Sequence, residues 1–151
     1  MEEGESVYFY HTTEKELRPI WGIMPDKILI VEDNPQNMKV LLMTLTPHGY
    51  TFIGATDGEE ALEKAVKNKP DLIIMDIRIP KVNGLEVTRR LRQMPATSHI
   101  PIIAVTAYAM KGDREKAIEA GCDAYLPKPI NTRQLPRVVA EMLLRRKQNI
   151  T

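Results

Sequence analysis

Five polar side chains stand at or just beyond the ends of short apolar runs, where they could act together. They are Glu32 and Asp33 after residues 27–31, Asp76 after 72–75, Thr106 after 102–105, and Lys128 shortly after 124–126. Three clustered carboxylates suit a hard cation with oxygen ligands, such as Mg²⁺. Taken singly, each residue has an ordinary explanation, because an Asp or Thr after a strand commonly caps a helix and a Lys-Pro pair often marks a turn.

The apolar runs predict the sheet that would bring these side chains together. They are short and rich in β-branched residues, as strands buried on both faces are. A further run at residues 50–55 makes five strands, and a helical pattern follows each one. Five consecutive βα units predict an α/β fold with a doubly wound, five-stranded parallel sheet. Ligands bind beyond the carboxyl ends of strands in such sheets, so we expect the five polar side chains to share one crevice.

Capping residues predict where several helices begin. Asn34 precedes a proline and is expected to cap the first helix. Asp57 opens the second helix, in which Val66 is expected to face the core. The last helix is expected at residues 132–147 with Thr132 as its cap. Pro136 then either costs one hydrogen bond or moves the start of this helix later in the chain.

The composition excludes several classes of protein. The chain has 151 residues, of which 43% are hydrophobic, so one buried core is expected. Its 21 basic and 20 acidic residues give a net charge of +1, which disfavours a nucleic-acid-binding protein. No apolar run approaches the roughly 18 residues of a membrane helix. Cys122 is the only cysteine, which excludes an internal disulfide and a cysteine-based zinc site. We expect a soluble, cytoplasmic monomer or weak dimer that binds neither nucleic acid nor membrane.

Residues 1–24 differ in composition from the rest of the chain. They hold four of the eight aromatic residues and show no clear period of 2 or 3.6 residues. We therefore divide the chain into a leader of uncertain status, residues 1–24, and a domain, residues 25–151. The leader is either a non-native or mis-assigned start or a docking segment, and the sequence leaves both open.

Four segments resemble the receiver domain of two-component response regulators. They are IVEDN at 30–34, IMDIRIP at 74–80 followed by NG at 83–84, AVTA at 104–107, and YLPKPI at 125–130. The resemblance covers about residues 27–147 and includes each signature position in order. It implies the flavodoxin-like, CheY-like strand order 2-1-3-4-5. We expect no DNA-binding output domain after residues 131–150, so the chain is most similar to stand-alone receivers or to those within hybrid histidine kinases.

The resemblance also implies a role for each site residue. Asp76 accepts a phosphoryl group from a phosphohistidine on a kinase or phosphotransfer protein. Asp33, Asp76 and the backbone carbonyl of Arg78 bind Mg²⁺, and Glu32 acts through a bound water. Lys128 neutralises one phosphoryl oxygen, and Thr106 donates a hydrogen bond to another. A carboxylate can form such an acyl phosphate once the group is positioned and its charge neutralised.

The same resemblance implies a switch that controls a downstream protein effector. Thr106 moves toward the phosphoryl group, and Tyr125 fills the space that it leaves. The responding face comprises the fourth helix (112–120), the fifth strand (124–126) and the last helix. Charged residues on this face are Lys111, Arg114, Lys116 and Arg133. The Lys128–Pro129 peptide bond is expected to be cis, as in relatives.

Two positions near the acceptor bear on how long the phosphoryl group lasts. These positions lie two residues after Asp76 and two residues after Thr106. Relatives that lose phosphate quickly tend to carry a small amide or acid at them, whereas this chain has Arg78 and Tyr108. Neither side chain is a good base at neutral pH, so we expect slow self-dephosphorylation. The chain is then not an enzyme in the ordinary sense.

Other classes fit the sequence less well. An aspartyl phosphatase has a second Asp where this chain has Arg78, and the glycine-rich sequence of a P-loop is absent. A flavodoxin needs a Ser, Thr and Gly-rich loop after the first strand. The chain's histidines show no ligand spacing; they are His11, His48 and His99. A pseudo-receiver scaffold would usually have lost one of the site residues, and none is missing here.

Overall fold

The strands form one mixed sheet, which we describe from a computed structural model covering residues 6–9, 25–107 and 110–150. Its strands are β1 (Ser6–Phe9), β2 (Lys27–Val31), β3 (Thr51–Ala55), β4 (Leu72–Asp76), β5 (Ile102–Thr106) and β6 (Ala124–Pro127). Their spatial order is β1-β3-β2-β4-β5-β6. Strands β2 to β6 all pair in parallel, which confirms the predicted five-stranded sheet and its 2-1-3-4-5 order.

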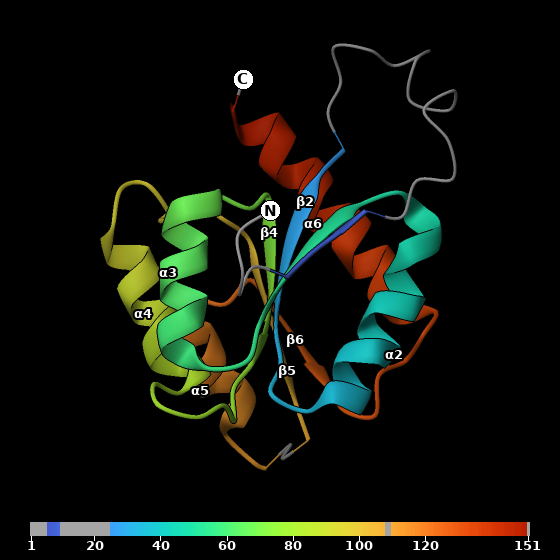
Figure 1. Cartoon of the computed structure of the whole chain (residues 1–151). Helices are drawn as coiled ribbons and strands as arrows, with labels where there is room; N and C mark the ends of the chain where they lie inside the picture. The colour runs from blue at the N-terminus through green and yellow to red at the C-terminus, as the bar shows by residue number, and fades with distance from the viewer. Residues whose placement is uncertain (1–5, 10–24, 108–109, 151) are drawn as a thin grey trace.

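Helices cover both faces of this sheet. The helices are α2 (Pro35–Leu45), the short 3₁₀ turn η2 (Thr46–His48), α3 (Gly58–Asn68), α4 (Gly84–Gln93), α5 (Asp113–Ala120) and α6 (Gln134–Ile150). Figure 1 shows α3, α4 and α5 on one side of the sheet and α2 and α6 on the other. This is the doubly wound arrangement predicted from the alternating pattern.

Alternate residues of the strands divide the interior into two cores. Leu29, Ile73 and Ile102 point to the side of α3, α4 and α5. Ile28 and Ile74 point to the side of α2 and α6. All five are fully buried, because a central parallel strand is covered on both faces. The sheet is thereby fixed firmly enough to hold the residues at its carboxyl edge in place.

Strand β1 is an addition that the sequence analysis did not predict. It pairs antiparallel with β3, with Ser6 opposite Gly54 and Phe9 opposite Thr51. A four-residue strand is too short for its periodicity to be read from sequence. Because β1 occupies the outer edge of β3, it satisfies backbone groups that a five-stranded sheet would leave open.

One expectation about a helix cap is wrong. Asn131, rather than Thr132, supplies the cap of α6, since its Oδ1 accepts hydrogen bonds from the backbone N–H groups of Arg133 and Gln134. Helix α6 begins at Gln134, which is the later start that was one of the two outcomes expected from Pro136. Pro136 then lies in the first turn, where its missing N–H costs nothing. The predicted caps Asn34 and Asp57 are confirmed.

The buried face of α3 also differs from expectation. Val66 is 43% exposed, whereas Lys64 is only 6% exposed. The Nζ atom of Lys64 donates to the backbone oxygen of Gly54 at 2.7 Å and lies 3.6 Å from the carboxylate of Glu60. These partners let the long apolar stem of the lysine pack inside.

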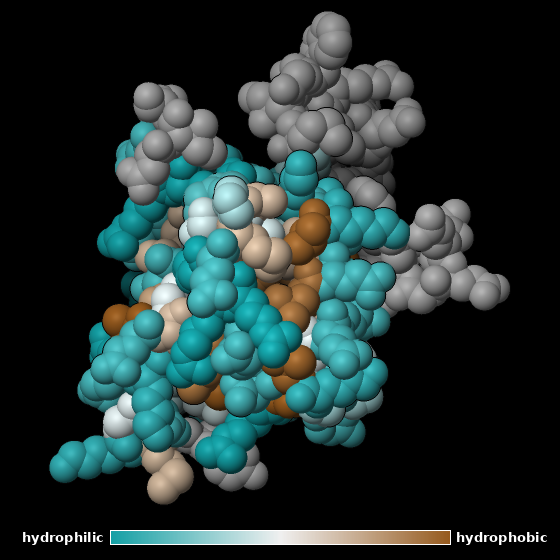
Figure 2. Space-filling view, turned by 90° about the vertical axis from the view of Figure 1, so that its left-hand side faces the viewer, coloured by the Kyte–Doolittle hydropathy of each residue, from teal (hydrophilic) through white to brown (hydrophobic). Residues whose placement is uncertain are grey.

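The outer surface of the α3, α4 and α5 layer is mostly polar. Figure 2, which views the molecule from that side, shows a largely hydrophilic face with its most extended apolar surface near the middle. Exposed large hydrophobic residues on these helices include Val66 and Ile118. Within the described part of the chain, no helix combines the length and apolar character needed to cross a membrane.

Candidate functional site

The polar side chains singled out from the sequence lie at one edge of the sheet. Asp76 is the last residue of β4, and Thr106 is the last residue of β5. Glu32 and Asp33 follow β2 directly, and Lys128 follows β6 directly. Since β2, β4, β5 and β6 run in parallel, their carboxyl ends meet at this edge.

Three carboxylates form the centre of the site. Glu32, Asp33 and Asp76 each offer an oxygen, and these oxygens lie within 4.8 Å of one another. Glu32 and Asp76 are only 2% and 5% exposed, whereas Asp33 faces solvent. An all-oxygen donor set with one open side matches Mg²⁺, which keeps several waters when bound to protein carboxylates. The residues present therefore fit this ion.

Lys128 bridges the two buried carboxylates. Its Nζ atom lies 2.6 Å from Oε1 of Glu32 and 2.9 Å from Oδ2 of Asp76. Burial alone would lower the pKa of Lys128, but the hydrogen bonds to Glu32 and Asp76 outweigh it and raise the pKa above its ordinary value. Lys128 is therefore fully charged at neutral pH. Burial raises the pKa of Glu32, against the opposing effect of its hydrogen bond to Lys128.

Backbone hydrogen bonds hold the carboxylates in position. The N–H of Asn34 donates to Oε2 of Glu32 at 3.1 Å, and the N–H of Arg78 donates to Oδ1 of Asp76 at 3.0 Å. The N–H of Lys128 donates to the backbone oxygen of Thr106 at 2.8 Å, which joins the ends of β5 and β6. The Lys128–Pro129 peptide bond is cis, which confirms that expectation.

A cleft opens in front of the carboxylates, toward α5. It has a volume of about 550 Å³, and its lining includes Asp33, Arg78, Thr106, Asp113 and Lys116. Thr106 is 1% exposed, so it forms the floor of the cleft. Asp113 and Lys116 were not expected at the site from the sequence. Their only signal was their position at the start of the helix that follows β5, because residues beyond the carboxyl ends of parallel strands commonly line the crevice.

The remaining candidate residues are placed as follows. Arg78 is exposed at the cleft, and Tyr108 lies outside the described residues. Tyr125 is half-buried on β6, and its hydroxyl is buried without a hydrogen-bond partner in the described part of the chain. Burial, together with the nearby carboxylates of Asp113 and Glu115, raises the pKa of Tyr125. Tyr125 therefore packs beside α5.

Comparison with known proteins agrees with this arrangement. The family model for the response regulator receiver domain matches residues 28–140. The chain is 48% identical over 116 residues to the polar-differentiation response regulator DivK of Brucella anthropi, covering 77% of this chain and 92% of that protein. It is 47% identical over 116 residues to DivK of Brucella ovis, with the same coverage.

Solved structures show the same fold. The receiver domain of the sensor histidine kinase PA1611 from Pseudomonas aeruginosa, which has a magnesium ion in its active-site cleft, matches with a TM-score of 0.74 and 38% identity. That match covers 80% of this chain and 98% of the other. A CheY-like receiver protein from Methanospirillum hungatei matches with a TM-score of 0.77 and 28% identity, covering 83% and 99%. The chain therefore belongs to the response regulator receiver domain family of two-component signalling systems.

Proposed function

We propose that this receiver accepts a phosphoryl group on Asp76 from the phosphohistidine of a sensor histidine kinase or a phosphotransfer protein. The observation that carries the proposal is the contact of Lys128 Nζ with Asp76 Oδ2 at 2.9 Å, inside a cluster of three carboxylates. An ammonium at that place can neutralise a phosphoryl oxygen, and the carboxylates can hold the divalent cation that phosphoryl transfer needs.

In the transfer step, a carboxylate oxygen of Asp76 attacks phosphorus and forms the new P–O bond. The P–N bond to the donor imidazole breaks, and its electron pair stays on that nitrogen. The product is an acyl phosphate, whose extra negative charge needs nearby cations and hydrogen-bond donors. Lys128 is the cation already in contact with the acceptor, and Thr106 supplies a hydroxyl at the neighbouring strand end.

Mg²⁺ bound at this site would neutralise oxygens of the transferring group. Asp33, Asp76 and the backbone carbonyl of Arg78 would hold it directly, and Glu32 would do so through water. The clustering of the three carboxylate oxygens within 4.8 Å supports this assignment. Lys128 engages both Glu32 and Asp76, whereas Asp33 is exposed, which favours Asp33 as a direct ligand.

We further propose that the phosphodonor packs against the groove beside α2. This groove has a volume of about 660 Å³ and reaches the site at Glu32 and Asp33. Farther along, Met38, Leu42 and Met43 line it, and Met43 is 65% exposed. A large exposed apolar side chain next to a charged reaction site is typical of a protein-docking surface.

The output of this receiver is a shift between two populated states, read by a downstream protein. Thr106 and Tyr125 are the proposed switch residues. Thr106 ends β5, and Tyr125 lies on the neighbouring strand β6, opposite Ala104. A buried tyrosine hydroxyl without a partner among the described residues gains from a change of position, which supports a moving Tyr125. The proposed partner face comprises α5, β6 and α6, where Lys111, Arg114 and Arg133 are exposed.

The phosphoryl group should persist for minutes or longer. Arg78, exposed at the cleft, is long and cationic and can pair with phosphoryl oxygens. We also predict that the bulky side chain of Tyr108 hinders the approach of water to the phosphoryl group. Neither side chain can act as a base that orients a water molecule, so neither assists hydrolysis of the acyl phosphate.

The test is incubation with Mg²⁺ and acetyl phosphate, followed by intact-mass measurement. We expect a gain of one phosphoryl group, its loss in Asp76→Asn, and its prevention by EDTA. Glu63→Gln, which alters an exposed carboxylate on α3, is the matched control and should be labelled normally. Unchanged mass in the folded wild-type protein under saturating donor would overturn the proposal and favour a pseudo-receiver scaffold.

A further inference from the structure

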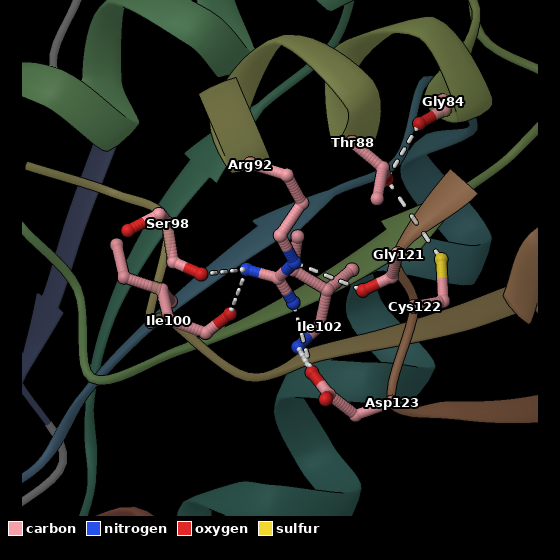
Figure 3. Close-up of polar contacts among 9 residues, drawn as sticks. All are labelled: Gly84, Thr88, Arg92, Ser98, Ile100, Ile102, Gly121, Cys122 and Asp123. Carbon is pink, nitrogen blue, oxygen red and sulfur yellow. Dashed lines mark hydrogen bonds and ion pairs between the residues drawn. The ribbon is translucent and has the colours of Figure 1, made fainter. Parts of the chain in front are cut away.

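A guanidinium clamp fastens the carboxyl-terminal end of α5 to its neighbours. Figure 3 shows the side chain of Arg92, on α4, reaching between two loops. Its Nε donates to the backbone oxygen of Gly121 at 3.0 Å, and its Nη1 donates to those of Ser98 and Ile100 at 3.1 and 2.6 Å. Its Nη2 lies 2.9 Å from Oδ2 of Asp123. One side chain thus joins three segments of the chain.

The clamp is closely fitted at Gly121. This residue ends α5 with a φ of 116°, a conformation that favours glycine. A Cβ atom there would lie 2.7 Å from Cγ of Arg92, so the absent side chain is what admits the arginine. Asp123 also accepts a hydrogen bond from the N–H of Ile102 at 2.8 Å, which ties the clamp to β5. The carboxyl-terminal end of α5 is therefore fixed to the sheet and to α4.

Among the described residues, the other end of α5 has fewer contacts that anchor it. The helix follows Gly112, which has a φ of 92° and provides no side-chain cap. The N–H of Met110 donates to Oδ2 of Asp113 at 3.0 Å, which joins the preceding loop to the first residue of the helix rather than to another element of the domain. Among the eight residues of α5, only Ala117 and Ala120 are buried, and both are near the clamped end. Small buried side chains oppose a tilt of the helix less than large ones would.

The loosely held end also borders the cleft in front of the acceptor. Asp113 and Lys116 line that cleft together with Asp33 and Thr106. Lys116 is exposed, and it has no ion-pair partner within the described residues. A phosphoryl group on Asp76 would add negative charge across this cleft, which attracts Lys116 and repels Asp113.

We propose that α5 works as a lever, with Arg92 as the positioning residue that fixes its pivot at Gly121 and Lys116 as the group that senses charge at Asp76. The proposal rests on the proposed phosphorylation of Asp76 and deepens it, because it names how the charge reaches the partner face. The amino-terminal end of α5 swings toward the acceptor, and the carboxyl-terminal end stays in place.

The geometry sets the size of the motion. At a rise of about 1.5 Å per residue, Arg114 lies about 10 Å from the pivot and Glu119 about 3 Å from it. A tilt of about 15°, similar to known rigid-body rotations, then moves Arg114 by about 3 Å and Glu119 by about 1 Å. A lever therefore predicts unequal displacements along one helix, which neither a rigid shift nor a static helix would give.

The experiment measures these displacements with pairs of spin labels. One label is placed on α3 at Glu63→Cys, and the other at Arg114→Cys or Glu119→Cys; all three positions are exposed. The single native cysteine, Cys122, is buried and escapes labelling. The distance between the two labels is measured by pulsed electron paramagnetic resonance with and without beryllofluoride and Mg²⁺. We expect the Arg114 pair to shorten by about 3 Å and the Glu119 pair by no more than about 1 Å. Equal changes in both pairs, or no change in either, would overturn the lever.

Two further variants assign the roles. Lys116→Gln should reduce the shortening of the Arg114 pair by about half or more, because a charge is lost from the cleft. The control Glu115→Gln changes an exposed residue that does not line the cleft and should leave the shortening intact. A full displacement in Lys116→Gln would exclude it as the sensor.

Arg92→Lys should release the pivot, because lysine cannot make the forked contacts of a guanidinium. The Glu119 pair should then move or broaden on addition of beryllofluoride, whereas Arg90→Lys, on the same helix, should behave as wild type. An unchanged Glu119 pair in Arg92→Lys would exclude Arg92 as the pivot. The ¹⁹F NMR signal of bound beryllofluoride is recorded in each sample. Its absence in the wild type would overturn the proposed function itself, and the lever with it.

Discussion

Replacing Gly58 with alanine should destabilise the protein through the loop that follows Asp76. Gly58 is the first residue of α3, and its N–H donates to the backbone oxygen of Pro80 at 3.1 Å. A Cβ atom at Gly58 would lie 1.9 Å from the backbone oxygen of Val82 and 2.7 Å from its Cβ. The nearest atom belongs to the backbone, so it cannot rotate away. The loop between β4 and α4 must move as a unit.

The expected loss of stability is about 2–3 kcal/mol. Overpacking of a tight contact costs about 1–3 kcal/mol. Loss of the hydrogen bond to Pro80 adds about 1 kcal/mol. The better helix propensity of alanine offsets at most about 1 kcal/mol of this loss. For a chain of this size, a net loss of this amount lowers Tm by about 5–10 °C.

Urea unfolding followed by circular dichroism measures this change as a lower midpoint at unchanged slope. Glu59→Ala is the matched control, because Glu59 is the next residue, is 68% exposed and makes only a surface ion pair with Lys81 at 3.7 Å. Glu59→Ala should change the free energy of unfolding by no more than about 0.5 kcal/mol. A Gly58→Ala midpoint equal to that of wild type would refute the reasoning, since it would mean that the loop accommodates the methyl group freely.

Three more predictions concern single residues. Lys81 has a φ of 69°, so Lys81→Gly should relieve strain and raise the free energy of unfolding by about 0.5–1 kcal/mol; a lower urea midpoint would contradict this. Burial raises the pKa of the Cys122 thiol above its ordinary value of 9.0, so Ellman's reagent should react slowly at neutral pH until urea unfolds the chain. Stability should also fall as the pH rises above that value, because only the unfolded thiol ionises readily. Lys128→Gln should leave two buried carboxylates without their cation, which lowers the urea midpoint more at alkaline than at acidic pH; an equal loss at both would count against the ion-pair account.

The sequence by itself determined the five parallel strands, their helices and the edge at which the site lies. Short runs rich in β-branched residues favour buried strands, and Asn34 and Asp57 cap helices through contacts with residues two or three positions away. Because the site residues lie at or just after strand ends, a prediction of the strands also predicts that Glu32, Asp76 and Lys128 lie at one edge of the sheet. These features depend on local pattern, which a sequence displays directly.

Tertiary structure decided the features that depend on contacts between distant residues. Lys128 touches Glu32 and Asp76 across separations of 96 and 52 residues, so the bridge exists only once β2, β4 and β6 are assembled. The burial of Lys64 instead of Val66 follows from a carbonyl oxygen on β3 that no helical period can show. The Arg92 clamp joins Ser98, Gly121 and Asp123 in the same way, because a guanidinium reaches any carbonyl that packing brings within hydrogen-bond distance.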